Sequence, residues 1–143
     1  MCFSMAAELY ELTGYSYCLE LLPEALDAEK KLKKPRNGRI GDIFFMYGVC
    51  YYKIGCSEKA LLYCDSAHQA FKKKQMYYQI AEVEIQKGRI YYKMGEFDIA
   101  IDKYLYALSI AKKLKDQQLE IKCKSNLADV YSEWGRYNKA IQL

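Results

Sequence analysis

The sequence predicts an all-α solenoid, a stack of antiparallel helix pairs with a period of about 40 residues. Three observations predict it. Gly55, Gly95 and Gly135 lie 40 residues apart, and Gly14 lies 41 residues before Gly55. A tyrosine stands four positions before each of these glycines, and an alanine stands five positions after the last three: Tyr10, Tyr51, Tyr91 and Tyr131; Ala60, Ala100 and Ala140. Similarity at a fixed period of this length is typical of helical repeat proteins.

Each complete repeat is expected to contain two helices that meet at the glycine, which can end a helix with a positive φ. Seven positions before the last three glycines stands a small residue, which lets the two helix backbones approach closely: Gly48, Gly88 and Ala128. In the second helix of the repeat at 77–116, one apolar stripe is expected to be buried: Ala100, Tyr104, Ala107, Leu108, Ala111 and Leu114. Ile101 and Leu105 lie beside it, where a neighbouring repeat would cover them.

This order of residues resembles the tetratricopeptide repeat family over residues 39–143. The matching elements are the small residue, the tyrosine, the glycine, an aromatic residue (Phe97 or Tyr137), the alanine and Tyr104. The resemblance implies a right-handed solenoid with repeats at 39–76 and 77–116, and an incomplete repeat at 117–143 whose second helix begins after Gly135. Residues 1–38 are expected to form a degenerate repeat in which Pro23 interrupts or delays the second helix. The incomplete last repeat leads us to expect a piece of a longer protein.

In the tetratricopeptide family the first helix of each pair lines a concave groove, and the resemblance carries this role to positions that differ between repeats. Variation over a constant scaffold is typical of a recognition surface. Amides could hold a peptide backbone, cations a carboxylate, and apolar residues a side chain. For any one residue, a plain solvated helix position is an equal alternative. The predicted peptide-binding groove residues are Phe45, Met46, Val49, Tyr52, Gln86, Arg89, Lys93, Lys122, Asn126 and Asp129.

The sequence therefore predicts an interaction module for a peptide or protein segment. Its repeat style resembles the sensor domains of bacterial peptide-pheromone receptors, which often follow a helix-turn-helix DNA-binding domain. The alternative is a structural scaffold or homo-oligomer that associates through exposed apolar residues such as Phe44, Phe45 and Met46. No phosphate loop or distinct pair of carboxylates is found, so we expect no enzyme activity and no cofactor or metal.

Other signals have simpler interpretations. A cluster of lysines recurs once per repeat, and we expect each cluster to end a helix, where the helix dipole stabilises cations, rather than to bind nucleic acid. The clusters are Lys30, Lys31, Lys33 and Lys34; Lys72, Lys73 and Lys74; Lys112, Lys113 and Lys115. Cys64 and His68 occupy core positions of the repeat and are expected to be structural. Trp134 stands where Ile54 and Met94 stand in other repeats, which favours a packing role. The absence of a secretory signal and of a long apolar segment predicts a cytoplasmic protein with reduced thiols.

Overall fold

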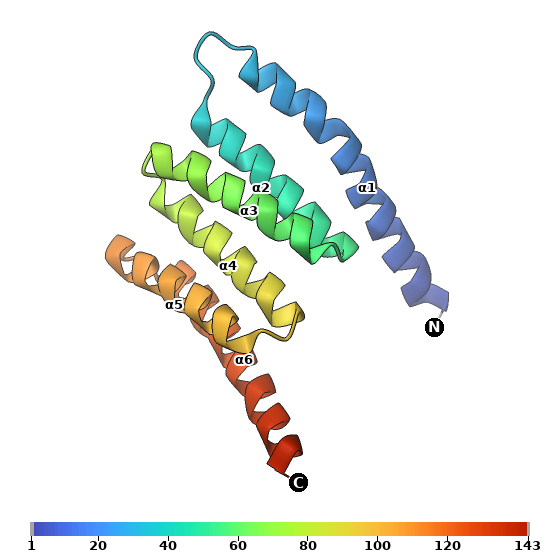
Figure 1. The fold of residues 1–143 in the computed structure, drawn as a ribbon, viewed down its shortest axis with the longest axis vertical. Coiled ribbons are helices and arrows are strands. Elements are labelled where there is room, and N and C mark those ends of the chain that lie inside the picture. Colours follow the sequence, from blue (N-terminus) through green and yellow to red (C-terminus); the bar gives the residue numbers. More distant parts are fainter. Residues whose placement is uncertain (1, 143) are drawn as a thin grey trace. The chain divides into compact units, whose positions relative to one another are not determined.

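The computed structural model describes the backbone of residues 2–142 and the side chains of residues 14–136. Within these residues the chain forms six helices joined by short connections and has no strand (Figure 1), which confirms the all-α prediction. The chain forms two compact units, Met1–Gln75 and Met76–Leu143. The helices are α1 (Cys2–Lys30), α2 (Asn37–Ile54) and α3 (Ser57–Lys73) in the first unit, and α4 (Tyr77–Lys93), α5 (Phe97–Leu114) and α6 (Gln117–Gln142) in the second.

Two helical hairpins, α2–α3 and α4–α5, form where the spacing predicts them (Figure 1). In the first hairpin, a Cβ atom on Gly48 would lie 2.7 Å from Sγ of Cys64. In the second, Gly88 faces the ring of Tyr104 in the same way. The small residue is therefore required because the facing side chain occupies the space of a Cβ atom. Ala128 stands at the corresponding position of α6 and is exposed.

The two hairpin turns have the same hydrogen bonds. Gly55 and Gly95 have φ values of 99° and 82°, in the left-handed region that glycine adopts without steric cost. The N–H of the residue after each glycine donates to the carbonyl oxygen of the tyrosine four positions before the glycine, at 2.9 Å for both Tyr51 and Tyr91. This is a Schellman arrangement, which satisfies the last carbonyls of a helix. It explains why glycine recurs at this position, since the turn requires a residue with a positive φ.

In the first unit α1 is one helix that packs against α2, so the expected division of residues 1–38 into two helices is wrong. Pro23 lies inside α1, although an internal proline costs a helix about 3 kcal/mol. An apolar stripe on both sides of Pro23 offsets this cost by packing against α2. Leu22 is buried with Ile43 and Tyr47, and further hydrophobic residues pack around them: Leu19, Leu26, Phe44, Tyr51 and Tyr63.

In the second unit α6 runs without interruption through Gly135, so the expected turn there is wrong. Gly135 has no positive φ, and no atom lies within 4 Å of the Cβ position that it lacks. Glycine permits a left-handed turn but does not impose one, and a continuous helix keeps its backbone hydrogen bonds. At its start α6 is capped by Asp116, whose Oδ1 accepts the N–H of Leu119 at 3.0 Å. The predicted match at Tyr137 and Ala140 lies outside the described side chains.

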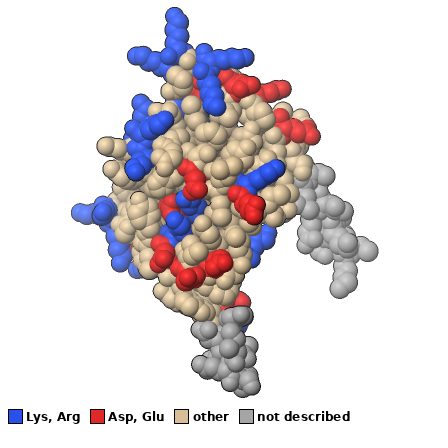
Figure 2. Space-filling view, in the orientation of Figure 1, with Lys and Arg blue, Asp and Glu red and all other residues tan. Residues whose placement is uncertain are grey.

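The buried stripe of α5 follows the prediction except at its last member: Leu114 is exposed, and the other five residues are buried. Of the two residues beside the stripe, Ile101 is buried and Leu105 is exposed. The recurring lysines do stand at helix C-termini, with Lys30, Lys72, Lys73, Lys112 and Lys113 in the last turns of their helices. Figure 2 shows Lys and Arg side chains gathered where the loop between α1 and α2 lies.

Candidate functional site

The first helices of successive repeats, α4 and α6, lie in contact in the second unit. They are joined by an ion pair in which Nζ of Lys122 donates to Oε2 of Glu82 at 2.8 Å. These two residues are 40 positions apart, which is one predicted repeat. The side chains of Lys122 and Glu82 are 38% and 23% exposed, so the pair lies at the edge of the α4–α6 contact. Lys122 is thus already engaged by a carboxylate within the chain.

The remaining predicted residues of this unit fall into the same register. On α4 the helical spacing from Glu82 leads to Gln86, Arg89 and Lys93, and on α6 the spacing from Lys122 leads to Asn126 and Asp129. We call this set, with Lys122, the α4–α6 face. Each series follows one stripe of its helix. With the 40-residue offset of the Lys122–Glu82 pair, Gln86 corresponds to Asn126 and Arg89 to Asp129.

Gln86 differs from the expectation of an open groove residue, since it is only 4% exposed. Its Nε2 atom is buried and has no hydrogen-bond partner among the described residues. A buried donor without an acceptor costs about 1–3 kcal/mol, so this amide would gain from any acceptor that reached it. The sequence could not indicate the burial, because glutamine at a helical position is usually solvated.

Asn126 is the most accessible amide of the α4–α6 face. It is half-buried, and its Nδ2 donates to the carbonyl oxygen of Lys122 at 2.9 Å, one turn earlier in α6. This bond orients the side chain and leaves its carbonyl oxygen without a recorded donor among the described residues. Arg89 is half-buried, whereas Lys93 and Asp129 are exposed. The face therefore offers an oriented acceptor between charged side chains of both signs.

In the first unit the four predicted residues all lie on α2. Met46 is exposed, and Phe45, Val49 and Tyr52 are half-buried. By helical spacing Phe45, Val49 and Tyr52 stand on the opposite side of α2 from Ile43 and Tyr47, which face the core with α1. This side of α2 is therefore partly apolar. The role of these residues in binding stays a prediction.

A buried ionic cluster of α4 and α5 was not predicted from the sequence. Glu84 is 3% exposed, and its carboxylate lies 3.5 Å from Nζ of Lys87 and 3.7 Å from Nζ of Lys103. Two cations beside one buried carboxylate compensate for much of its lost hydration. Charged residues at these positions look like ordinary surface residues in the sequence, and only tertiary packing distinguishes them.

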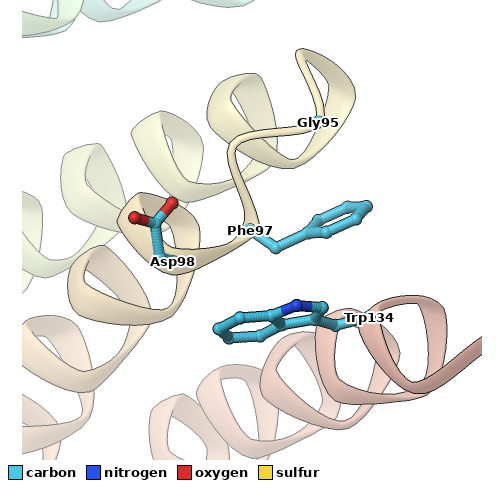
Figure 3. A pocket seen from close by; sticks show the side chains of 4 residues that line it. All are labelled: Gly95, Phe97, Asp98 and Trp134. Atoms are coloured by element: carbon cyan, nitrogen blue, oxygen red, sulfur yellow. The ribbon is translucent and has the colours of Figure 1, made fainter. Parts of the chain in front are cut away.

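A separate pocket of about 340 Å³ lies where the α4–α5 turn meets α6, and we call it the aromatic pocket (Figure 3). Its lining residues are Gly95, Phe97, Asp98 and Trp134. Figure 3 shows the rings of Phe97 and Trp134 projecting from α5 and α6 into the same space. Trp134 is half-buried and lines this opening, in addition to the packing role that its position predicted.

The described side chains contain no group of three or more His, Cys, Asp or Glu that could hold a metal ion. Cys64 is fully buried and His68 half-buried, in agreement with core positions of the repeat. Burial raises the pKa of the Cys123 thiol to about 11, with a smaller contribution from the charge of Glu82. In the described part of the chain no helix is both long and apolar enough to cross a membrane.

Comparison with known proteins agrees with this fold. A family model described as tetratricopeptide repeat matches residues 79–143, which contain most of α4 and all of α5 and α6. Tetratricopeptide repeats generally mediate protein–protein interactions, and the family is typically non-catalytic. No curated protein matches the sequence.

Among solved structures, the crystal structure of BtubC (BKLC) from P. vanneervenii is similar, with a TM-score of 0.75 and 19% sequence identity. The match covers 84% of this chain and 49% of that chain, so this chain spans about half the length of its structural relative. At this identity the likeness shows the fold, a set of tetratricopeptide-like helical hairpins.

Proposed function

We propose that this chain is a protein-binding module that holds an extended peptide segment on the α4–α6 face. The main support is that α4 and α6 lie in contact, are joined by the Lys122–Glu82 ion pair, and carry the predicted groove residues of two successive repeats. The packing positions are alike in the α2–α3 and α4–α5 hairpins, while the predicted groove residues on α2 and α4 differ. A constant scaffold with a variable face suits recognition.

Asn126 is the residue on which this proposal depends most. One N–H of its Nδ2 donates to the backbone carbonyl oxygen of Lys122, which orients the amide and leaves its own carbonyl oxygen to accept an N–H from a peptide backbone. Asp129 and Arg89 can select charged side chains of the segment. Lys122 is held by Glu82, so we assign it to positioning the face rather than to a direct role in carboxylate binding.

A peptide-display selection against this chain, followed by thermal unfolding with the selected peptide, tests the proposal. A ligand that binds only the native state raises the melting temperature. Asn126→Ala should abolish this shift, while Lys124→Ala should keep it, because Lys124 is exposed two residues earlier on another side of α6. An unchanged shift in Asn126→Ala would assign the peptide to another surface.

The finer form of the proposal is a cytoplasmic peptide-sensing domain of a larger bacterial transcriptional regulator. Its support is the repeat style and the free cysteines of the described chain, which suit a reducing compartment. A helix-turn-helix domain in the natural gene, upstream of Met1, would support it. A gene that begins at Met1 would leave only the binding module.

The alternative scaffold function has support in exposed hydrophobic residues, which favour self-association. Met46 of α2 is 48% exposed and Ile121 of α6 is 66% exposed. Sedimentation equilibrium over a wide range of concentrations separates the two functions. A stable oligomer with no peptide-dependent shift supports the scaffold.

A further inference from the structure

We propose that Cys18 and Cys50 form a redox modification site, at which a low-molecular-weight disulfide oxidises the two thiols to a bond that ties α1 to α2. The site lies in the first unit, outside the α4–α6 face, and goes beyond the function proposed above. Both residues are free cysteines in the structure. Such a pair stays reduced in a reducing compartment and responds when small disulfides accumulate there.

The packing of α1 on α2 brings the two cysteines to the same level of the helix pair. The two helices are antiparallel (Figure 1). Leu22 of α1 packs with Ile43 and Tyr47 of α2. Cys18 stands one turn before Leu22, and Cys50 stands one turn after Tyr47. In an antiparallel pair these two steps lead in the same direction, so they place the cysteines opposite each other on the packed faces.

The two thiols interact directly. Burial raises the pKa of the Cys50 thiol, and the Cys18 thiol raises it further through its charge and through a hydrogen bond between the two side chains. Cys50 is 5% exposed, so this hydrogen bond lies within the α1–α2 contact. A disulfide needs the two Cβ atoms roughly 3.5–4.5 Å apart. Two hydrogen-bonded thiols on facing helices need only small side-chain rotations to reach that geometry.

The difference in burial gives the order of the two chemical steps. Cys18 is half-buried and meets the oxidant first, whereas Cys50 is buried. The Cys18 thiolate attacks one sulfur of a disulfide such as oxidised glutathione, forms a mixed disulfide and expels one glutathione thiolate. Cys50 then loses its proton, attacks the Cys18 sulfur and expels the second glutathione thiolate. The two expelled thiolates take up the two protons that the cysteines lost, so two cysteines are oxidised and one glutathione disulfide is reduced.

The other cysteines of the first unit that the structure describes lack this arrangement. Cys56 and Cys64 are eight residues apart along α3, about 12 Å of helix, which is too far for a disulfide. Cys64 faces α2 at Gly48. Cys50 stands two residues after Gly48, on a different side of α2, so it is directed away from Cys64. Cys18 is therefore the partner that the helix packing gives to Cys50.

A redox titration of the whole chain in mixtures of reduced and oxidised glutathione tests the proposal. The products are trapped in acid, and the linkages are identified by peptide mapping under nonreducing conditions. We expect the Cys18–Cys50 disulfide as the main product within one chain. Its equilibrium constant should be at least about tenfold higher in the native chain than in the same chain unfolded in urea, because a bond that fits the native state also stabilises it.

Three single substitutions separate the roles of the cysteines. Cys50→Ala keeps a small apolar side chain in the core and should leave glutathione on Cys18 as a stable mixed disulfide. Cys18→Ser, at the half-buried position, should remove the disulfide and leave Cys50 reduced in the native chain, which tests the order of the steps even if Cys50→Ala does not fold. Cys56→Ser is the matched control at an exposed position and should not change the Cys18–Cys50 equilibrium.

Three results would overturn the proposal. The first is a main disulfide that joins other cysteines or two copies of the chain. The second is a mixed disulfide that accumulates on Cys18 in the unmodified chain, which would mean that Cys50 cannot reach it. The third is an equilibrium constant that is no higher in the native chain than in urea, which would mean that the folded helices hold the two sulfur atoms apart.

Discussion

A Cβ atom placed on Gly88 would lie 2.5 Å from Cε1 of Tyr104, closer than real side chains approach. The Tyr104 ring is 2% exposed and cannot move away into solvent. This single contact explains why glycine at this place accompanies tyrosine sixteen residues later in the α4–α5 hairpin. The smaller Cys64 fills the corresponding site opposite Gly48.

Gly88→Ala is therefore expected to destabilise the chain by about 1–2 kcal/mol. Overpacking a buried contact typically costs about 1–3 kcal/mol, and alanine regains up to about 1 kcal/mol of helix propensity. Gly135→Ala is the matched control, because its Cβ would meet no atom within 4 Å and its helix is continuous. It should be neutral or stabilising by up to about 1 kcal/mol. Urea unfolding followed by circular dichroism measures both, and equal effects would contradict the packing argument.

The helix pairs could be predicted from the sequence because the spacing of the glycines and tyrosines indicates where helices end and where two helices touch. A left-handed residue ends a helix, and a missing Cβ marks where two helices touch. The same glycines could not show where a turn fails to form. Gly14 and Gly135 stand in phase with Gly55 and Gly95, yet both lie inside continuous helices, because glycine permits the turn without requiring it.

The candidate site was less predictable, because binding surfaces depend on which side chains become buried. Glu84 and Gln86 have the polarity of surface residues but lie in the interior. Phe97 and Trp134 are far apart in the sequence, and they line the same aromatic pocket because α6 meets the α4–α5 turn there. A signal was present, since Trp134 replaces smaller hydrophobic residues of other repeats, but its partner could not be identified without the fold.

The Lys122–Glu82 pair predicts a measurable coupling between α4 and α6. In a double-mutant cycle of Lys122→Met and Glu82→Gln, we expect a coupling free energy of about 0.3–1 kcal/mol, the usual range for a partly exposed ion pair. The exposed Glu133–Arg136 pair within α6 is the control and should give about 0–0.5 kcal/mol. Unfolding in urea supplies the four free energies of each cycle. A coupling near zero for the first cycle would contradict a stabilising role for the Lys122–Glu82 pair.

The end of α1 is joined to the start of α2 by Glu29 and Arg36, which predicts a pH dependence of stability. Nε and Nη2 of Arg36 donate to the two carboxylate oxygens of Glu29, each at 2.8 Å, and the Arg36 backbone N–H donates to Oε1 at 3.1 Å. These bonds lower the pKa of Glu29 from its ordinary 4.5, although burial acts in the opposite direction. The contribution should be fully present above that ordinary pKa.

The contribution of Glu29 should then be lost as the pH falls through the lowered pKa of the folded state. We expect the unmodified chain to be more stable than Glu29→Gln near pH 7, with a difference that shrinks as the pH falls below 4.5 and through the lowered pKa. Urea midpoints measured across this range provide the test. Glu24→Gln, at an exposed position of α1, should show no such convergence. A difference between the chain and Glu29→Gln that stays constant with pH would remove Arg36 as the cause.

The cysteines should differ sharply in reactivity, because the thiolate is the reactive form. Cys123 is fully buried and its pKa is raised to about 11 by burial, whereas Cys56 is exposed at the start of α3. With iodoacetamide near pH 8, we expect rapid alkylation of Cys56 and protection of Cys123 until the chain unfolds. Peptide mapping by mass spectrometry, with and without urea, follows each site. Cys64 is buried against Gly48 and should behave like Cys123, so labelling of either at the rate of Cys56 would mean that the helices packed around that cysteine open in the native state.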